Sequence, residues 1–315
     1  MPLDQSRLQH AVRARLPDAG DEIALSRIRT GKFNESYFVA AGGGEYVLRV
    51  APSDEAVFCF YERKMMKQEP GIHAMLLEKT SVPVARIVAF DDTHELIDHD
   101  FMIMERLPGV PLTEAGGVDT EAVFEEVGGM LAQCHAITAE RYGYLGEHRP
   151  MEPQEAWVEA FRIMWNAMLD DIVGVGHYGM EERSAMSRLL ERHIEHFDRP
   201  VDSSFLHMDI WHQNIMVDDA GAVTGIVDWD RALWGDVEIE FAVLDYCGVS
   251  TPGFWRGYGK ERDASRSAMI RRVFYLLYEL QKYIVIRHGR GNDPAAARQY
   301  KFQAMHMARA SLLGG

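Results

Sequence analysis

Short apolar stretches separated by turn residues dominate the first hundred residues of the 315-residue chain. Their composition predicts strands, whereas Leu8, Val12 and Leu16 recur every four residues and predict a helix over 4–16. The glycine-rich run 41–44 favours a hairpin turn. The pattern therefore predicts strands at about 23–29, 36–40, 45–50, 84–90 and 100–105, together with a long helix over 58–79.

Longer helical periodicity follows beyond residue 111. Val123, Val127 and Leu131, for example, recur on one face of a predicted helix. A short β-rich stretch at about 213–228 interrupts this pattern. The predicted helices of this part cover 120–136, 153–169, 181–196, 266–288 and 294–312.

The run Leu-Pro-Gly-Val-Pro at 107–111 separates the two parts, and its prolines restrict the backbone. The sequence thus predicts an α+β fold with a small β-rich lobe over 1–107 and a larger, mainly helical lobe over 108–315. The expected hinge lies at about 105–111. A cleft between two such lobes is a common place for a ligand.

Charge narrows the classes of partner. The chain has 33 Lys and Arg against 48 Asp and Glu, a net charge of −15, which disfavours nucleic acid and anionic membranes. Its 3 cysteines are far apart, so reduced thiols are expected. No apolar run reaches the length of a membrane span, and the first residues do not read as a signal peptide. We therefore expect a soluble, cytoplasmic protein; the sequence does not indicate its oligomeric state.

The densest chemical signal lies between His207 and Asp228. Asp209 and Asn214 are five residues apart, so one tight loop can direct both side chains into one cavity. Two short apolar strands then return the chain and bring Asp228 beside Asn214. Phosphoryl transfer needs a carboxylate near the attacking hydroxyl and oxygen ligands for Mg²⁺. These residues supply both requirements.

This segment resembles the H-x-D-x-x-x-x-N catalytic loop and metal aspartate shared by protein kinases and the aminoglycoside phosphotransferase family. Trp211 and the triplet Asp228-Trp229-Asp230 are similar to the small-molecule branch of that superfamily, and no Ala-Pro-Glu motif follows. The stretch Trp-Gly-Asp-Val-Glu at 234–238 resembles the family's Gly-Asp-Pro motif, with valine in place of proline. The resemblance implies a bilobal protein-kinase-like fold.

The resemblance also implies roles for these residues. Asp209 would orient the acceptor hydroxyl and accept its proton, while Asn214 and Asp228 would hold Mg²⁺. His207 would bond the loop backbone. A metal site made by His207 and His212 is disfavoured, because their spacing is five residues rather than four and no cysteine is near.

A phosphate-covering loop is the second element of the resemblance. Residues 30–37 are similar to the pattern Gly-Gly-x-Ser-Asn-x-x-Tyr, with phenylalanine in place of its serine. It follows that this lobe would bind the nucleotide. The expected contacts in this loop are Gly31, Lys32, Asn34 and Ser36.

Arg49 stands where the family places its phosphate-binding lysine. Arginine is also cationic and can hold phosphate oxygens bidentately. Glu69 is its expected carboxylate partner, with Glu62 as the alternative. The backbone of Glu105 and Leu107 is expected to hold the base, which leaves ATP and GTP both possible.

The acceptor is less well defined. Trp211 and Asp230 are expected near it, and Asp245 and Glu279 are candidates for binding a cationic amino sugar among aromatic side chains. The resemblance implies transfer of the γ-phosphate to a small hydroxylated molecule. The first candidate is an aminoglycoside or other antibiotic, which would make the protein a resistance enzyme.

Other acceptors and other classes stay open. A choline-like amino alcohol or a sugar is the alternative acceptor. A protein kinase is disfavoured by Trp211 and the missing Ala-Pro-Glu motif. A non-catalytic nucleotide-binding protein is kept open by Arg49, although the presence of Asp209, Asn214 and Asp228 argues against it.

Overall fold

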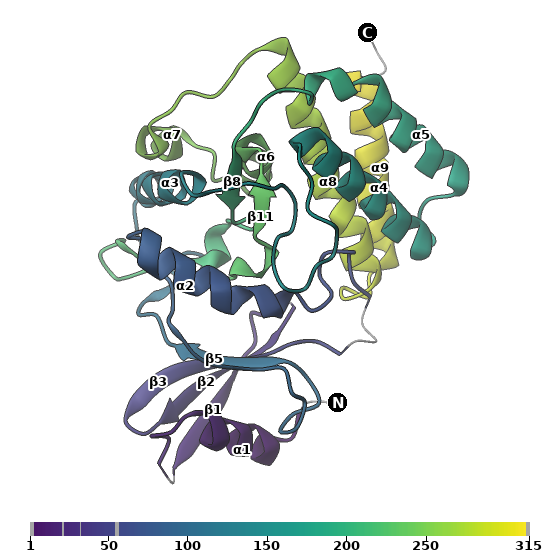
Figure 1. Cartoon of the computed structure of the whole chain (residues 1–315). Helices are drawn as coiled ribbons and strands as arrows, with labels where there is room; N and C mark the ends of the chain where they lie inside the picture. The colour runs from purple at the N-terminus through teal and green to yellow at the C-terminus, as the bar shows by residue number, and fades with distance from the viewer. Residues whose placement is uncertain (1–2, 21, 32, 54–56, 313–315) are drawn as a thin grey trace.

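The computed structural model describes residues 3–20, 22–31, 33–53 and 57–312. A small lobe built on a sheet joins a larger, mostly helical lobe, and the helix α2 (Glu69–Lys79) lies between them (Figure 1). The α+β, protein-kinase-like architecture predicted from the sequence is therefore confirmed.

An antiparallel sheet of five strands, in the order β1-β2-β3-β5-β4, forms the small lobe. The predicted hairpin is present: Ala41 pairs with Gly44, and Gly42 and Gly43 between them have φ of 56° and 77°. Positive φ at both central positions suits glycine and matches the twist of the two strands. The strands are β1 (Ile23–Ile28), β2 (Glu35–Ala41), β3 (Gly44–Val50), β4 (Ile87–Asp91) and β5 (Phe101–Glu105).

The helix α1 (Gln5–Arg15) covers one face of this sheet. Its Leu8 and Val12, at most 1% exposed, belong to one apolar core with Val39 and Leu48 of the sheet. The four-residue spacing of the apolar positions thus orients the helix on the sheet. The helix covers one face of the sheet, so side chains on the other face can point toward the large lobe.

The long helix predicted over 58–79 is wrong in its first half. The chain forms turns from residue 60, then a 3₁₀ segment (Met65–Gln68), and becomes α-helical only from Glu69. Lys64 has a φ of 59°, in the left-handed region, and Pro70 occupies the first turn of α2. Proline lacks the backbone N–H that a helix interior needs, so it marks the start of α2 instead of its middle.

Seven α-helices are described in the large lobe. The last two, α8 and α9, have the predicted bounds. The helices α6 and α7 were not predicted, because they are short and have apolar residues on all sides, which leaves no helical periodicity to detect. None of the helices in the described ranges combines the length and the apolar character required to cross a bilayer. They are α3 (Thr120–His135), α4 (Trp157–Gly174), α5 (Met180–Arg192), α6 (Val237–Cys247), α7 (Pro252–Tyr258), α8 (Arg266–His288) and α9 (Pro294–Leu312).

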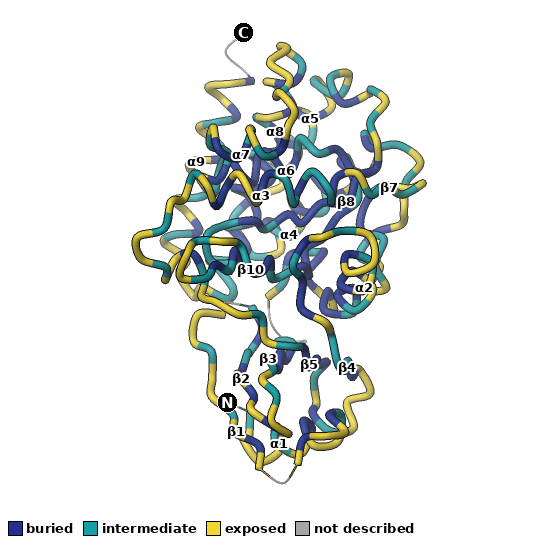
Figure 2. Tube along the Cα trace, turned by 90° about the vertical axis from the view of Figure 1, so that its left-hand side faces the viewer, coloured by how far each residue is buried: buried dark blue, intermediate teal, exposed yellow. Residues whose placement is uncertain are grey.

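Aromatic side chains fill the centre of the large lobe, where Figure 2 shows the buried residues concentrated. The ring of Phe161 lies 5.0 Å from the rings of both Phe197 and Tyr275. The indole N–H of Trp157 donates to the Tyr275 hydroxyl at 2.7 Å, so these two buried polar groups are paired. This core fixes α8 against α4.

Two three-stranded sheets lie under the interlobe region, in the orders β10-β9-β6 and β11-β8-β7. The proline-rich linker ends in β6, where Val110 pairs with Val217 of β9. The hinge segment is therefore fastened to the hairpin that carries the motif residues. The strands are β6 (Val110–Pro111), β7 (Thr138–Ala139), β8 (Ser203–Leu206), β9 (Ile215–Val217), β10 (Val223–Ile226) and β11 (Leu233–Gly235).

Candidate active site

The β9–β10 hairpin brings the motif residues together. Ile215 pairs with Ile226, and the N–H of Val227 donates to the carbonyl of Asn214 at 3.0 Å, which places Asp228 beside Asn214. The Asn214 amide donates to the backbone carbonyl of Asp209 at 2.9 Å and to its Oδ2 at 3.3 Å. The expected juxtaposition of Asp209, Asn214 and Asp228 is thus what the structure contains.

His207 holds the loop from inside. Its Nδ1 accepts from the N–H of Asp209 at 3.2 Å, so its Nε2 carries the proton that is donated to the carbonyl of Val227 at 3.0 Å. Complete burial lowers the pKa of His207, which favours this neutral form. His212 lies apart, with its ring edge-on to Phe124 at 5.3 Å.

Glu240 of α6 supports the same loop and was missed by the sequence analysis. One carboxylate oxygen accepts from the N–H of Met208 at 2.7 Å, and the other accepts from the N–H of His207 at 3.2 Å and from His135 at 2.7 Å. Met208 has a φ of 66°, so this backbone geometry needs outside support. No local pattern distinguishes Glu240 from the other glutamates of its helix.

Arg49 reaches three carboxylates. Its guanidinium lies 2.5 Å from Glu69, 2.6 Å from Asp228 and 3.0 Å from Asp230. The alternative partner, Glu62, pairs instead with Arg290 at 2.7 Å. The structure therefore joins Arg49 to Glu69, and it also ties this strand to the Asp228 segment of the large lobe.

The cluster carries more negative than positive charge. Burial first, and then the neighbouring Asp228 and Glu69, raise the pKa of Asp230 well above its ordinary value; Asp230 also accepts from the Asn34 amide at 3.2 Å. Asp228, whose side chain is 45% exposed, is the member of the cluster that is most open to the cavity. Such crowded carboxylates with one exposed member favour a divalent cation.

Asp209 behaves differently. Burial raises the pKa of its carboxyl group, but Arg231 and Lys282 outweigh that effect and lower the pKa below the ordinary value. Arg231 lies 2.9 Å from Asp209, and Lys282 lies 3.9 Å away. The carboxylate is therefore charged at neutral pH. Neither cation was predicted from the sequence, because nothing local relates them to Asp209.

A cavity of about 1120 Å³ runs from the sheet of the small lobe to α8. The expected site residues that line it are Gly31, Ser36, Arg49, Glu105, Leu107, Asp209, Trp211, Asn214, Asp228 and Asp230. Lys32 lies outside the described residues. Asn34, Glu69 and His207 do not line the cavity. Each hydrogen-bonds to a residue that does: Asn34 to Asp230, Glu69 to Arg49, and His207 to Asp209.

One end of the cavity has apolar walls suited to a planar base. The N–H of Glu105 already donates to the carbonyl of Arg86 at 2.9 Å, so it is not the group that holds a base there. The apolar lining at this end comes from Val47, Ala85, Met104, Met216 and Ile226.

The two acidic residues proposed for a cationic acceptor do not line the cavity. Asp245 lies 2.8 Å from both Arg262 and Arg272. Glu279, 1% exposed, lies 2.5 Å from Lys282 and 3.6 Å from Arg231. The expectation of open carboxylates for an amino sugar at these positions is corrected, because both are already paired with cations.

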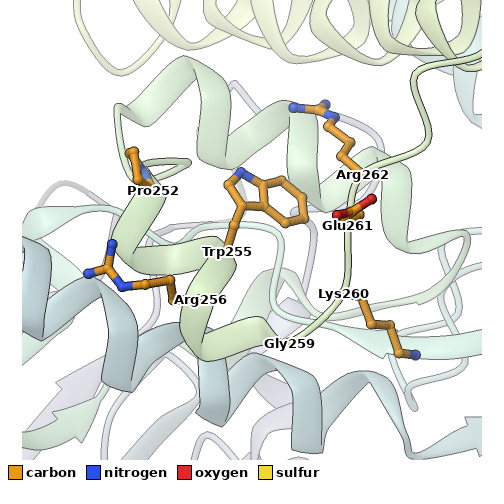
Figure 3. Close-up of a pocket in the computed structure, with 7 residues that line it drawn as sticks. All are labelled: Pro252, Trp255, Arg256, Gly259, Lys260, Glu261 and Arg262. Atoms are coloured by element: carbon orange, nitrogen blue, oxygen red, sulfur yellow. The ribbon is translucent and has the colours of Figure 1, made fainter.

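A second pocket, of about 430 Å³, lies on α7 and the loop after it (Figure 3). Trp255 and Arg262 line it, and the Arg262 guanidinium lies 5.8 Å from the indole ring. It shares no lining residue with the larger cavity, so none of the motif chemistry belongs to it.

A protein-only metal site is absent from the part of the chain that the structure describes: no group of three or more His, Cys, Asp or Glu side chains could hold an ion. Mg²⁺ in phosphoryl-transfer sites needs only one or two side-chain ligands, since phosphate oxygens and water complete its coordination. The crowded Asp228 and the adjacent Asn214 fit that requirement.

Comparison with known proteins agrees with this geometry. The model of the phosphotransferase enzyme family matches residues 24–270, and the chain belongs to this family. It is a kinase of the class that phosphorylates an alcohol group of a small molecule. Among its relatives, the probable ketoamine kinase of Vibrio vulnificus is 27% identical over 82% of this chain and 85% of its own length. The hygromycin-B 4-O-kinase of Escherichia coli is 22% identical over 69% and 60%, respectively.

Solved structures show the same fold. A fructosamine-3-kinase candidate from Haemophilus somnus superposes with a TM-score of 0.70 at 16% identity, covering 95% of this chain and 97% of its own. The aminoglycoside phosphotransferase APH(4)-Ia, in a ternary complex with AMP-PNP and hygromycin B, gives 0.68 at 16% identity, covering 97% and 99%. At these identities the likeness concerns the fold.

Proposed function

We propose that the protein transfers the γ-phosphate of ATP to a hydroxyl group of a carbohydrate-like small molecule. The observation that carries the proposal is the meeting of Asp209, Asn214 and Asp228 on one cavity that Arg49 also lines. Phosphoryl transfer depends on positioning and charge stabilisation more than on covalent catalysis by the protein, and this set supplies both.

Asp209 is the proposed catalytic carboxylate. The acceptor oxygen bonds to the γ-phosphorus while the bond from that phosphorus to the β,γ-bridging oxygen breaks, and ADP leaves. The hydroxyl proton passes to Asp209. A carboxylate of low pKa suffices, because the loose transition state needs little early deprotonation. Arg231, 2.9 Å away, keeps this carboxylate charged and fixed.

Asn214 and Asp228 are the proposed ligands of Mg²⁺, which would supply charge neutralisation at the β- and γ-phosphates. Arg49, held by the fully buried Glu69, is the proposed contact to the phosphates. Arg49 lies 2.6 Å from Asp228, so the proposed phosphate contact and the proposed metal ligand are direct neighbours.

The nucleotide is proposed to be ATP. A related structure that binds AMP-PNP supports this choice. The base would lie between the apolar residues of the cavity, against the backbone of the 105–107 segment. GTP is the alternative, since backbone contacts can serve either purine.

The acceptor is proposed to be a sugar derivative, because the relatives include probable ketoamine kinases from three Vibrio species. An aminoglycoside, with a role in antibiotic resistance, is the second candidate and is favoured by the hygromycin-B kinase among the relatives. A choline-like amino alcohol is the third candidate. Neither Asp245 nor Glu279 lines the cavity, so the carboxylates expected to hold a cationic group are missing for both of these acceptors.

Release of ADP from Mg·ATP over a panel of sugars, ketoamines, aminoglycosides and amino alcohols tests the proposal. We expect acceptor-dependent turnover in the wild type and its loss in Asp209→Asn. Binding of Mg·AMP-PNP without acceptor-dependent turnover on any member would instead favour a non-catalytic nucleotide-binding protein.

A further inference from the structure

The acceptor end of the cavity is walled by α6, α8 and the loop after α8. We call this set the acceptor wall: Tyr246, Cys247, Lys282, Tyr283, Arg287 and Arg290, all of which line the same cavity as Asp209. The acceptor wall contains three cations; Glu62, a carboxylate that lines the same cavity, pairs with one of them, Arg290. This composition is unexpected in a protein with a net charge of −15.

Two of these cations already have carboxylate partners. Lys282 lies 2.5 Å from Glu279, and Arg290 lies 2.7 Å from Glu62. Arg231, which also lines the cavity, is matched by Asp209 at 2.9 Å. Each of these three positive charges is therefore compensated within the protein.

Arg287 is the exception. Among the described residues, its guanidinium makes no hydrogen bond and no ion pair, and its Nε is buried without a partner. Its positive charge is therefore uncompensated among the described residues, and an anion in the cavity would supply a partner for the guanidinium. Arg287 follows Tyr283 by one helical turn, so both side chains lie on the same face of α8 and line the same end of the cavity.

Aromatic rings complete this end. The Tyr283 ring lies 5.3 Å from the Tyr246 ring and 5.0 Å from the Tyr300 ring, and all three tyrosines line the cavity. Tyrosines combine apolar faces with hydroxyl groups, as a carbohydrate ring requires. The chemistry of the acceptor wall therefore suits a polyhydroxylated ring that carries a negative charge.

We propose that the acceptor carries an anionic group, a carboxylate or a phosphate monoester, which Arg287 binds. This inference rests on the proposed kinase function and specifies its substrate class. The anionic group is distinct from the hydroxyl that Asp209 orients. A cationic acceptor would instead meet the uncompensated positive charge of Arg287 and lose affinity.

Matched probes test the charge preference. The protein, saturated with Mg²⁺ and AMP-PNP to fill the nucleotide part of the cavity, is titrated calorimetrically with D-glucose, D-glucuronate, D-glucose 6-phosphate and D-glucosamine. We expect at least one anionic probe to bind about tenfold or more tightly than D-glucose, as a charge-assisted contact implies. The two anionic probes separate a carboxylate from a phosphate monoester. Equal binding of all four probes, or tighter binding of D-glucosamine, overturns the proposal.

Variants then assign the preference to one side chain. Arg287→Met should reduce the advantage of the anionic probe to within about twofold of D-glucose, whereas Arg287→Lys should keep most of it. Arg188→Met, on the exposed face of α5, is the matched control and should leave the preference unchanged. An anionic preference that persists in Arg287→Met also overturns the proposal.

The two levels of inference fail separately. If the wild type does not bind Mg·AMP-PNP, the kinase proposal fails, and the probes can still be compared on the free protein. If AMP-PNP binds and neutral or cationic acceptors are phosphorylated in preference, the kinase stands and the anionic acceptor is rejected.

Discussion

Arg49 of the small lobe lies 2.6 Å from Asp228 of the large lobe, through Nη2 and Oδ1. The residues are 179 positions apart in the chain. Arg49 is the proposed phosphate contact and Asp228 the proposed metal ligand, so one bond joins the groups that act on the nucleotide from opposite sides. Binding of Mg·ATP would have to redistribute these charges.

Removing Arg49 should cost both stability and nucleotide affinity. Arg49→Ala leaves the fully buried Glu69 and the buried Asp230 without their cation, so unfolding should become easier by about 3 kcal/mol or more. Thermal melting and AMP-PNP titration measure the two effects. Arg7→Ala, which breaks the exposed pair with Asp98, is the control and should cost much less, because exposed ion pairs contribute little to stability. Equal losses in the two variants would contradict this prediction.

Asp228→Asn should remove the effect of Mg²⁺ on nucleotide binding. The substitution deletes one charge from a cluster crowded with carboxylates, so the fold should keep or gain stability. We expect AMP-PNP affinity to become nearly independent of Mg²⁺ concentration, as followed by calorimetry. Asp219→Asn, at an exposed turn position of the same hairpin, should behave like the wild type. An unaltered Mg²⁺ dependence in Asp228→Asn would rule out its role as a ligand.

Asp209→Asn should lower kcat by roughly 10²–10⁴-fold, the usual contribution of a positioned acid–base group. The shape of the side chain is kept, so the Asn214 bonds and the affinity for Mg·AMP-PNP should change little. Single-turnover measurement of ADP formation, alongside a thermal shift with AMP-PNP, separates chemistry from binding. Turnover close to that of the wild type would refute the mechanism.

Glu240 should act by positioning the catalytic loop. Glu240→Ala leaves the N–H groups of His207 and Met208 without their acceptor, at roughly 1–3 kcal/mol for each buried group. We expect kcat to fall while the KM for ATP stays within about threefold, because Glu240 does not line the cavity in which the nucleotide is proposed to bind. Glu240→Gln retains one acceptor oxygen and should recover part of the activity. A KM effect without a kcat effect would place Glu240 in a different role.

Asp171 of α4 should make stability depend on pH. Burial first, together with the nearby Glu62, raises its pKa to about 7, although the Phe60 N–H donates to it at 2.6 Å. The folded state thus binds a proton that the unfolded chain, with a pKa of about 3.9, releases earlier. Stability from this group is full below about pH 4 and falls as the pH rises to 7.

Asp171→Asn tests that assignment. The amide oxygen can still accept from Phe60, but no charge forms. The variant should be more stable than the wild type at pH 8, on the order of 1 kcal/mol after allowing for partial exposure, and similar to it near pH 4. Melting temperatures across this range provide the measurement. A parallel pH dependence in both proteins would assign the effect to other groups.

Local sequence determined much of the secondary structure and the centre of the site. The periodicity of α8 and α9 and the glycine turn at 41–44 specify their elements, because helix period and turn geometry depend on neighbouring residues. The spacing of Asp209, Asn214 and Asp228 works in the same way: a loop and a hairpin bring them together. The prediction of one helix over 58–79 was wrong before Glu69, because Pro70 favours the first turn of a helix and the apolar pattern alone did not show this.

Tertiary structure alone decided which distant charges meet. Glu240 supports the loop of His207, and Arg231 and Lys282 surround Asp209, although no motif relates them in sequence. From the sequence, Asp245 and Glu279 were expected to be free to bind a ligand, whereas in the structure both are paired with cations of the protein. The chain encodes local geometry in its spacing, whereas the partner of a charge depends on packing between elements far apart in sequence. For that reason the kind of chemistry was readable from the sequence, and the charge of the acceptor end was not.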